Sequence, residues 1–399
     1  MRPPLAEAPA SIFPAFFIQA FIFVCLFFAL LFDVAELTLF SLIILAMGIG
    51  SYLWSRISLD HVNCNIALNT TRLFPGERLK IEIRVINSKL LPVLLKIDLF
   101  THRSMIKPDG DQWIREEICL FWFQQSVISR ELFPKKRGVY NLGPPILQGG
   151  DIFGFFFKTE KAEDRLEVVV YPRIVPIRPL SLPKRAFFGI PGMRSPIEDP
   201  YHIFGTRDYQ AGRPARSIHW KASARHHRLQ EKLCEPAQQE KILILLDVDQ
   251  FEKTPTDFEK SLEAIASLIL QLDRQRIAVG FATNGTIAGN GSNIIPISRS
   301  AVQMASILET LAGVSAEKAG PVTDILAGGY TIPWGVTSIY FACHRCRQTR
   351  LAKAFMVYRN IPACFVLAQK SNEDEIPDTL QQGHTVYLDN LLAPEDRKK

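Results

Sequence analysis

The sequence predicts a multidomain protein with an N-terminal transmembrane helical hairpin, a β-sandwich and a C-terminal doubly wound α/β domain. Two long uncharged apolar runs open the chain, and residues of alternating polarity follow them. Toward the C-terminus, apolar strand-like runs alternate with helical patterns. We place the expected regions at 1–56 for the hairpin, 57–180 for the sandwich, 181–240 for a basic segment and 241–399 for the α/β domain.

The average composition conceals these regions. The chain has 399 residues, a net charge of +6 and 47% apolar residues, which is ordinary for a globular protein. Its 23 Gly and 26 Pro follow no period and neither end is a low-complexity run, which excludes a collagen-like chain and wholesale disorder. Nine of the 27 Phe residues lie in the first 40 positions, so the apolar excess belongs to the N-terminal region.

Two runs of 18 residues each, 15–32 and 37–54, are expected to cross a membrane as helices. Neither contains a charge, and about 18 such residues are enough to span a bilayer. A signal peptide would have a basic start and a shorter run, and a buried hairpin of a soluble protein would show a polar stripe. The short connection 33–36 predicts antiparallel helices, which small residues of the second run would allow to pack closely: Ala46, Gly48, Gly50 and Ser51.

The charges that flank the two runs predict cytoplasmic termini. Asp33 and Glu36 lie in the connection, whereas Arg2 and Arg56 lie at the outer ends, and basic flanks stay on the cytoplasmic side. Seven scattered cysteines, an odd number, agree with a reducing compartment. We therefore expect a multi-pass protein of the cell inner (plasma) membrane, with two helices and cytoplasmic soluble domains.

The region 57–180 is expected to be a β-sandwich. In Leu79–Ile86, apolar residues alternate with charged ones, which is typical of a half-buried strand. Further strands are expected at Leu94–Phe100, Glu117–Phe123 and Glu167–Tyr171, and several short strands without a long helix favour a sandwich. No catalytic set is recognisable among these residues, so the region is interpreted as a rigid spacer above the membrane.

A basic segment, 207–232, precedes the α/β region. It contains seven bases and two acids, and therefore +5 of the net charge of +6. One interpretation is a surface for an anionic partner, which means lipid headgroups, nucleic acid or an acidic protein; the other is a solvated face with internal ion pairs. Nucleic acid is disfavoured because Tyr209 and Trp220, the two aromatic residues of the segment, do not make a stacking platform.

The region 241–399 alternates strand and helix patterns. The run Ile242–Leu246 is typical of a strand that is buried on both faces, and Asp257–Arg274 follows with a helical period. Such alternation predicts a parallel, doubly wound sheet, in which ligands bind at the carboxyl ends of the strands. Asp247 and Asp249 lie at such an end.

The basic segment also carries a specific pattern. Its residues are Arg207, Tyr209, Gly212, Arg213, Arg216, Trp220, Lys221 and Arg225, then Glu235, before the apolar strand that ends in Asp247. This pattern resembles the signature of the family catalogued as domain of unknown function 58. The resemblance extends to residues 137–144 and 151–154 and to the paired N-terminal helices, and so covers essentially the whole chain.

The resemblance implies a membrane-anchored protein with a von Willebrand factor type A-like α/β domain. Members of the family often accompany MoxR-type AAA+ ATPases and are thought to help them assemble or remodel other complexes. No enzymatic activity is established for the family. We therefore expect a non-enzymatic binding and assembly module whose signature residues meet a protein partner or pair with carboxylates such as Glu235.

Type A domains typically hold a divalent metal at an Asp-x-Ser-x-Ser strand end, with further oxygen ligands from later loops. Here Asp247 matches the first position, Asp249 and Phe251 replace the two Ser residues, and Thr323 is the candidate from a later loop. Two carboxylates and one hydroxyl make a poor Mg²⁺ site, so a degenerate, metal-free domain is expected. The alternative is a metal- or thiol-dependent enzyme that uses Asp247 and Asp249, or the C-x-x-C pair Cys343 and Cys346.

Overall fold

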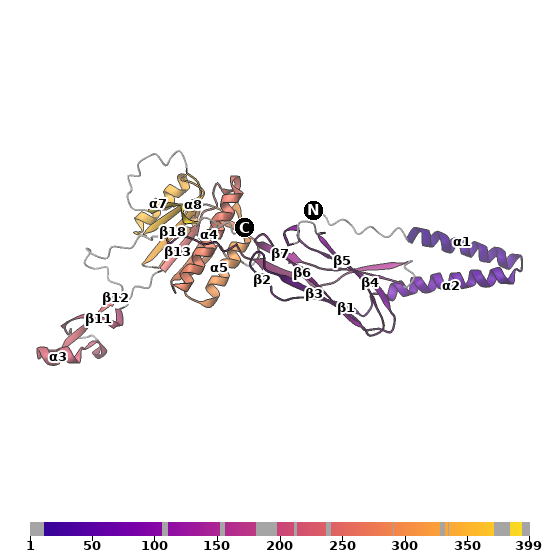
Figure 1. The fold of residues 1–399 in the computed structure, drawn as a ribbon, viewed down its shortest axis with the longest axis horizontal. Helices are drawn as coiled ribbons and strands as arrows, with labels where there is room; N and C mark the ends of the chain where they lie inside the picture. The colour runs from indigo at the N-terminus through magenta and orange to yellow at the C-terminus, as the bar shows by residue number, and fades with distance from the viewer. Residues whose placement is uncertain are drawn as a thin grey trace, which may run out of the picture. The chain divides into compact units, whose positions relative to one another are not determined.

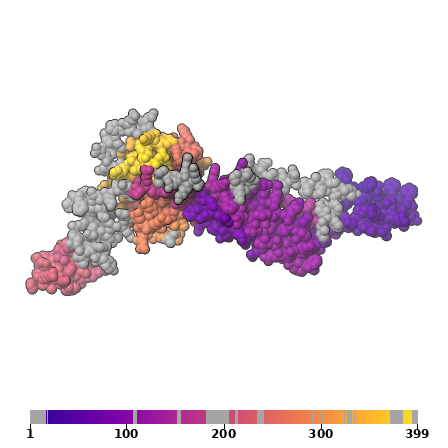
Figure 2. Space-filling model, viewed as in Figure 1, coloured from indigo at the N-terminus to yellow at the C-terminus, as the bar shows by residue number. Residues whose placement is uncertain are grey.

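In a computed structural model, the chain divides into two compact units, Met1–Arg173 and Ile174–Lys399. The structure describes residues 12–105, 111–151, 156–180, 198–210, 214–236, 241–289, 291–327, 332–333, 335–370 and 384–392. In Figures 1 and 2 the colour runs from the N-terminus to the C-terminus, and residues outside these ranges are drawn in grey.

The first unit begins with two helices, α1 (Ile12–Leu31) and α2 (Ala35–Ile57), which run antiparallel (Figure 1). Between them the chain turns at Asp33, which has a left-handed backbone. Of the described residues, only those of α2 form a helix that is long and apolar enough to cross a membrane, and the described apolar stretch of α1, Gln19–Leu31, is shorter. One apolar helix near the N-terminus of this chain is therefore a candidate membrane anchor.

Small residues form a buried stripe along α2. Ser41, Ser51 and Ser55 are buried on one stripe of α2, and a Cβ on Gly48 would collide with the Gln19 amide. This stripe has the helical spacing that brings residues three and four apart to one face. The expected close packing therefore involves Gly48 and Ser51, whereas Ala46 and Gly50 are exposed because they lie off the stripe.

The rest of the first unit is built from short strands. They are β1 (Val62–Leu68), β2 (Arg72–Leu73), β3 (Leu79–Asn87), β4 (Val93–Phe100), β5 (Trp113–Leu120), β6 (Gln125–Leu132), β7 (Gly138–Leu142), β8 (Ile146–Gly150), β9 (Phe157–Lys161) and β10 (Leu166–Val170). The sheets have the orders β1-β3-β6, β5-β4-β8-β9 and β2-β10-β7. The first two are antiparallel throughout.

One hydrophobic core joins these sheets. Every second residue of β3, from Leu79 to Val85, and every second residue of β4, from Val93 to Leu99, is fully or almost fully buried in it. Successive side chains of a strand point to opposite faces, so β3 and β4 each turn one face toward this shared core. Burial of each such Leu, Ile or Val contributes about 1.5–3 kcal/mol.

The strand expected at Glu117–Phe123 is correct in part. Strand β5 ends at Leu120, and Phe121–Phe123 form a tight turn in which Phe123 has a left-handed backbone (φ 52°). Aromatic residues favour strands, which explains the prediction. Gln124 overrides this preference: its side-chain oxygen accepts a hydrogen bond from the Phe121 amide at 2.9 Å, and this closes the turn.

The second unit contains a six-stranded sheet of order β16-β14-β13-β18-β19-β20. Its strands are β13 (Lys241–Leu246), β14 (Ala278–Thr283), β16 (Ile294–Ser298), β18 (Val336–Ala342), β19 (Ala363–Leu367) and β20 (His384–Tyr387). All pairings are parallel except that of β14 with β16. The main helices are α4 (Pro255–Arg274), α5 (Ala301–Gly313) and α7 (Arg347–Tyr358), with short α6 (Val322–Ala327) and α8 (Leu388–Leu391).

Strand β13 is buried on both faces, as expected. Leu243 and Leu245 pack with Ala352 and Met356 of α7 on one side, and Ile244, which points to the other side, is also fully buried. Sheets with both faces covered are typical of α/β proteins. Since β14 and β18 flank β13 on opposite sides, the winding reverses at β13, and ligands bind at such a reversal.

A separate ribbon carries the basic segment. Strand β11 (Glu198–Asp208) pairs antiparallel with β12 (Gln230–Pro236), and the short helices η2 (Ala215–Ser217) and α3 (Trp220–His226) lie between them in the chain. A further two-stranded pair is formed by β15 (Gly285–Ile287) and β17 (Val314–Lys318). We call the ribbon with η2 and α3 the signature module.

Candidate functional site

An ion pair lies at the base of the signature module. The register of the ribbon sets Arg207 of β11 opposite Glu231 of β12. The Arg207 guanidinium donates to Glu231 Oε1 from Nε at 2.8 Å and from Nη2 at 2.5 Å. The Glu231 side chain is 1% exposed, so Arg207 stabilises a buried negative charge and has a structural role.

Helix α3 is fixed to β12 by polar contacts. His219 caps the helix, because its Nδ1 accepts from the Ala222 amide at 3.1 Å, and its own amide donates to the Gln230 carbonyl at 2.8 Å. The Ser223 hydroxyl accepts from the Gln230 amide at 2.8 Å. His227, with a left-handed backbone, ends the helix. These contacts fix which residues of the segment turn outward.

Of the signature residues whose side chains the structure describes, four are exposed: Arg216, Trp220, Lys221 and Arg225. Trp220 is 68% exposed, which is unusual for a large aromatic side chain. Tyr209 is half-buried, and its amide donates to the Leu229 carbonyl at 2.9 Å. Gly212 and Arg213 lie outside the described residues, as does the side chain of Glu235.

The carboxylate found opposite Arg207 is Glu231, and the sequence alone did not point to it. The sequence suggests Glu235 as a partner because it follows the signature residues, whereas Glu231 is one of two acids inside the basic segment. The antiparallel register of β11 and β12 decides the pairing, and no periodicity in the segment indicates that register.

A second polar cluster lies at the carboxyl end of β13. Asp247, 1% exposed, accepts at Oδ2 from the Tyr340 hydroxyl at 2.6 Å and at Oδ1 from the Asn284 amide at 2.9 Å. The Asp249 amide also donates to Oδ1, at 3.1 Å. Asn284 follows β14 and Tyr340 lies in β18, so the parallel neighbours of β13 supply the donors. Burial, and next the Asp247 carboxylate, raise the pKa of Tyr340, so its hydroxyl keeps its proton.

The predicted metal residues therefore have other contacts. Both Asp247 oxygens accept hydrogen bonds, and Asp249 Oδ2 lies 3.4 Å from Lys318 Nζ. Thr323 is in α6, and its side chain is outside the described part of the chain. Among the residues described, no three His, Cys, Asp or Glu side chains are grouped as metal ligands.

The C-x-x-C pair follows β18. Cys343 is buried and lies 3.4 Å from the Thr254 hydroxyl, and Cys346 lies 3.4 Å from the Thr349 hydroxyl. Burial raises the pKa of Cys343, whereas a nucleophilic or metal-bound cysteine needs a lowered pKa. Both are free cysteines, and Cys346 begins α7 at its N-cap position.

Alkylation should distinguish buried Cys64 and Cys364 from exposed Cys119. Burial raises the pKa of Cys64 and of Cys364 to about 11, so that at pH 8 about one thiol in a thousand is ionised. We expect iodoacetamide to modify exposed Cys119 in the folded chain and to leave Cys64 and Cys364 intact. Peptide mass spectrometry measures this; equal modification of all three in folded protein would contradict the buried positions.

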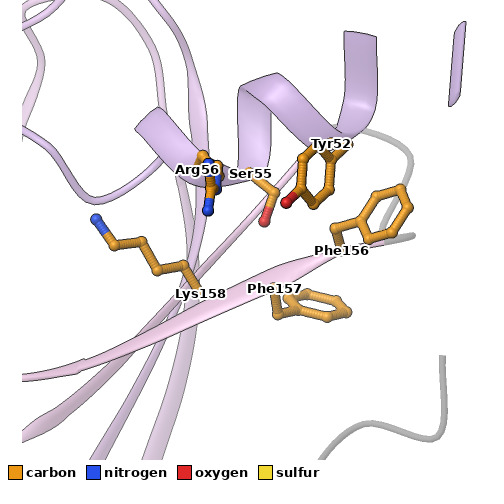
Figure 3. A pocket seen from close by; sticks show the side chains of 6 residues that line it. All are labelled: Tyr52, Ser55, Arg56, Phe156, Phe157 and Lys158. Atoms are coloured by element: carbon orange, nitrogen blue, oxygen red, sulfur yellow. The ribbon is translucent and has the colours of Figure 1, made fainter. Parts of the chain in front are cut away.

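A pocket of about 370 Å³ lies in the first unit where α2 meets β9 (Figure 3). It is lined by Tyr52, Ser55 and Arg56 of α2, by Phe156, and by Phe157 and Lys158 of β9. The Tyr52 and Phe156 rings pack edge-on, with their ring centres 5.6 Å apart, and the Arg56 guanidinium carbon lies 5.5 Å from the centre of the Tyr52 ring. Lys158 Nζ lies 2.9 Å from Asp60 Oδ1. The end of α2 thus has aromatic walls beside basic groups.

Comparison with protein families gives one match. The family described as "Protein of unknown function DUF58" matches residues 205–330. Residues 205–330 belong to the DUF58 family. The DUF58 region begins inside β11, so it includes the signature module from residue 205 onward, together with Asp247 and Asn284. It ends before Tyr340 and the C-x-x-C pair. The match confirms the family resemblance over residues 205–330, and the parts of the resemblance at 137–144, at 151–154 and in the N-terminal helices lie outside it.

Other comparisons add no function to the DUF58 match. No curated protein matches the chain. Among solved structures, a CARDB domain from Pyrococcus furiosus in complex with di-metal ions is 14% identical, covers 27% of this chain and 91% of its own, and has a TM-score of 0.20. The DNA glycosylase AlkC of Pseudomonas fluorescens is 11% identical, with 31% and 36% coverage and a TM-score of 0.19. A β-glucosidase of Listeria innocua is 16% identical, with 27% and 16% coverage and a TM-score of 0.18.

Proposed function

We propose that this protein is a membrane-anchored, non-enzymatic protein-binding and assembly module that works with a MoxR-type AAA+ ATPase. The observation that carries the proposal is that the signature module contains two kinds of residue, those bonded within its fold and those that are exposed. Arg207, His219 and Ser223 form hydrogen bonds within the module, whereas Trp220 and three bases, Arg216, Lys221 and Arg225, are exposed.

The exposed residues have the chemistry of a protein interface. Trp and Arg are the residue types most enriched among side chains that dominate binding energy, because they combine a large contact area with directed hydrogen bonds. Arg216, Lys221 and Arg225 give this surface a positive charge. The partner surface that fits is therefore acidic, with an apolar recess for the Trp220 ring.

The anchor is proposed to consist of both N-terminal helices. Helix α2 is a candidate span, and the whole apolar run 15–32 has the length to be a second. Acids in the connection and Arg56 at the end of α2 favour cytoplasmic termini. On this reading, both soluble units lie on the cytoplasmic side of the inner (plasma) membrane.

The α/β region is proposed to be a type A-like domain that has lost its metal site. The sheet places Asp247 at the carboxyl end of β13, where such a domain would bind a metal. Tyr340 and Asn284 donate to the Asp247 oxygens that a cation would require. Together with the raised pKa of Cys343, this leaves the metal- or thiol-dependent enzyme as the weaker alternative, and metal analysis of purified protein distinguishes the two.

Crosslinking and co-purification from native membranes test the proposal. We expect the full-length chain to capture an AAA+ ATPase, and Arg216→Lys to reduce capture about tenfold, since lysine cannot reproduce the forked contact of arginine with a carboxylate. The matched control is Arg347→Lys at an exposed position of α7. Undiminished capture by Arg216→Lys would remove Arg216 from the interface, and capture of no ATPase would refute the proposed partner.

A further inference from the structure

Four large apolar side chains are exposed together in the first unit, near α2. Leu90 lies in the β3–β4 connection, and Phe121, Trp122 and Phe123 form the turn between β5 and β6. Each is more than half exposed, and Trp122 is 61% exposed. We call these four residues the apolar tip. A sandwich core requires buried side chains, so such exposure calls for another explanation.

Hydrogen bonds hold the two loops of the apolar tip side by side. Asn87, which is fully buried, donates from Nδ2 to the carbonyls of Leu91 and Phe121, both at 2.9 Å. The Phe123 amide donates to the Lys89 carbonyl at 3.2 Å. The apolar tip is therefore a built surface whose two loops keep one arrangement.

The same loop is bonded to the end of α2. The Trp54 indole donates to the Pro92 carbonyl at 3.1 Å. Lys89 Nζ donates to the Ile57 carbonyl at 2.6 Å and to the Ser58 carbonyl, which are the last backbone acceptors of the helix. Burial lowers the pKa of Lys89 to about 8, as expected for an amine that is withdrawn from water to cap a helix end.

We propose that the apolar tip enters the interfacial layer of the lipid bilayer beside α2. This inference rests on the proposed membrane anchoring of α2. A helix that ends at Ile57 brings Trp54 to the level of the lipid headgroups, and the contacts of Trp54 and Lys89 place the neighbouring loop at that level.

The groups around the end of α2 fit a bilayer better than a protein partner. Arg56 lies on the pocket that adjoins α2, at the level where a cation can meet the phosphates of anionic lipids, whereas Lys158 beside it is paired with Asp60. Tyr and Trp rings are typical of this layer because one end is apolar and the other can form hydrogen bonds. The surface is continuous with the proposed anchor, so the bilayer covers it without any further molecule.

Quenching of Trp122 fluorescence by brominated lipids tests the inference. The full-length chain is reconstituted into vesicles of phosphatidylcholine and phosphatidylglycerol, with or without bromine near the glycerol end of the acyl chains. Subtracting the spectrum of Trp122→Phe from that of the wild type isolates the emission of Trp122 among the five tryptophans. The matched control is Trp220→Phe, which isolates an equally exposed tryptophan of the signature module.

We expect the isolated Trp122 emission to be lost in brominated vesicles and the isolated Trp220 emission to persist. If the chain resists carbonate extraction and Trp122 is not quenched, the inference is overturned while the anchoring stands. If carbonate extracts the chain from the vesicles, the proposed anchoring fails and the inference fails with it. The same subtraction with Trp54→Phe isolates the emission of Trp54, whose quenching reports that α2 is in the bilayer.

Discussion

Replacing Arg207 with methionine is expected to unfold the signature module while the parallel sheet stays folded. The substitution keeps most of the side-chain volume but removes the guanidinium that donates twice to Glu231. Removing one member of a buried ion pair costs about 3–5 kcal/mol, since it strands the opposite charge in a site of low polarity. A two-stranded ribbon with one short helix is too small to absorb such a loss.

Hydrogen exchange of the full-length chain measures this effect. Amides of β11, β12 and α3 should lose protection in Arg207→Met, and amides of β13 and β18 should keep it. The matched control is Arg228→Met, which removes an exposed pair with Asp208 in the same module and should cost less than about 1 kcal/mol. If the amides of β11, β12 and α3 stay as well protected in Arg207→Met as in Arg228→Met and in the wild type, the Arg207 pair does not stabilise the module.

Replacing Asp247 with alanine is expected to destabilise the α/β region by about 3 kcal/mol or more. Three donors lose their acceptor: the buried Tyr340 hydroxyl, the buried Asn284 amide group and the partly buried Asp249 backbone amide. Each buried donor left unsatisfied costs about 1–3 kcal/mol. Asp247→Asn should cost less. The side-chain oxygen of the new residue still accepts from the Asn284 and Asp249 amides, and the Tyr340 hydroxyl can rotate to accept a hydrogen bond from the new NH2 group.

The loss of stability is measured as a shift in the midpoint of urea unfolding, which is monitored by hydrogen exchange of the β13 and β18 amides. The control is Asp249→Ala, which removes a partly exposed contact with Lys318 and should shift the midpoint little. Mg²⁺ should leave the wild-type midpoint unchanged, since a ligand stabilises only the state that binds it. A Mg²⁺-dependent rise that Asp247→Ala abolishes would instead establish a metal site.

The sequence predicts most elements of this fold because their signals are local. Alternation in Leu79–Ile86 indicates β3, and the apolar run Ile242–Leu246 indicates β13. The turn at Phe121–Phe123 is missed because a single side chain, Gln124, overrides the strand preference of three aromatics. The Phe123 amide of this turn donates to the Lys89 carbonyl, a contact between distant parts of the chain that no local pattern indicates.

The sites are less predictable because they depend on pairings between distant residues. Asp247 is recognisable from its place after an apolar strand, but Tyr340 reads as an ordinary core aromatic, and only the parallel pairing of β13 with β18 brings its hydroxyl to the carboxylate. Likewise, the basic segment shows its charge directly, whereas the division between inward Arg207 and outward Trp220 depends on the ribbon register and on the cap of α3.

Photo-crosslinking from position 220 tests the central claim, that the exposed face of the signature module binds a protein partner. A photoreactive amino acid replaces Trp220 in the full-length chain in native membranes, and the control carries it at Tyr358, 86% exposed at the end of α7. We predict one dominant protein adduct from position 220, containing an AAA+ ATPase, and none of comparable yield from position 358. Lipid adducts alone, or equal protein adducts at both positions, would contradict the claim.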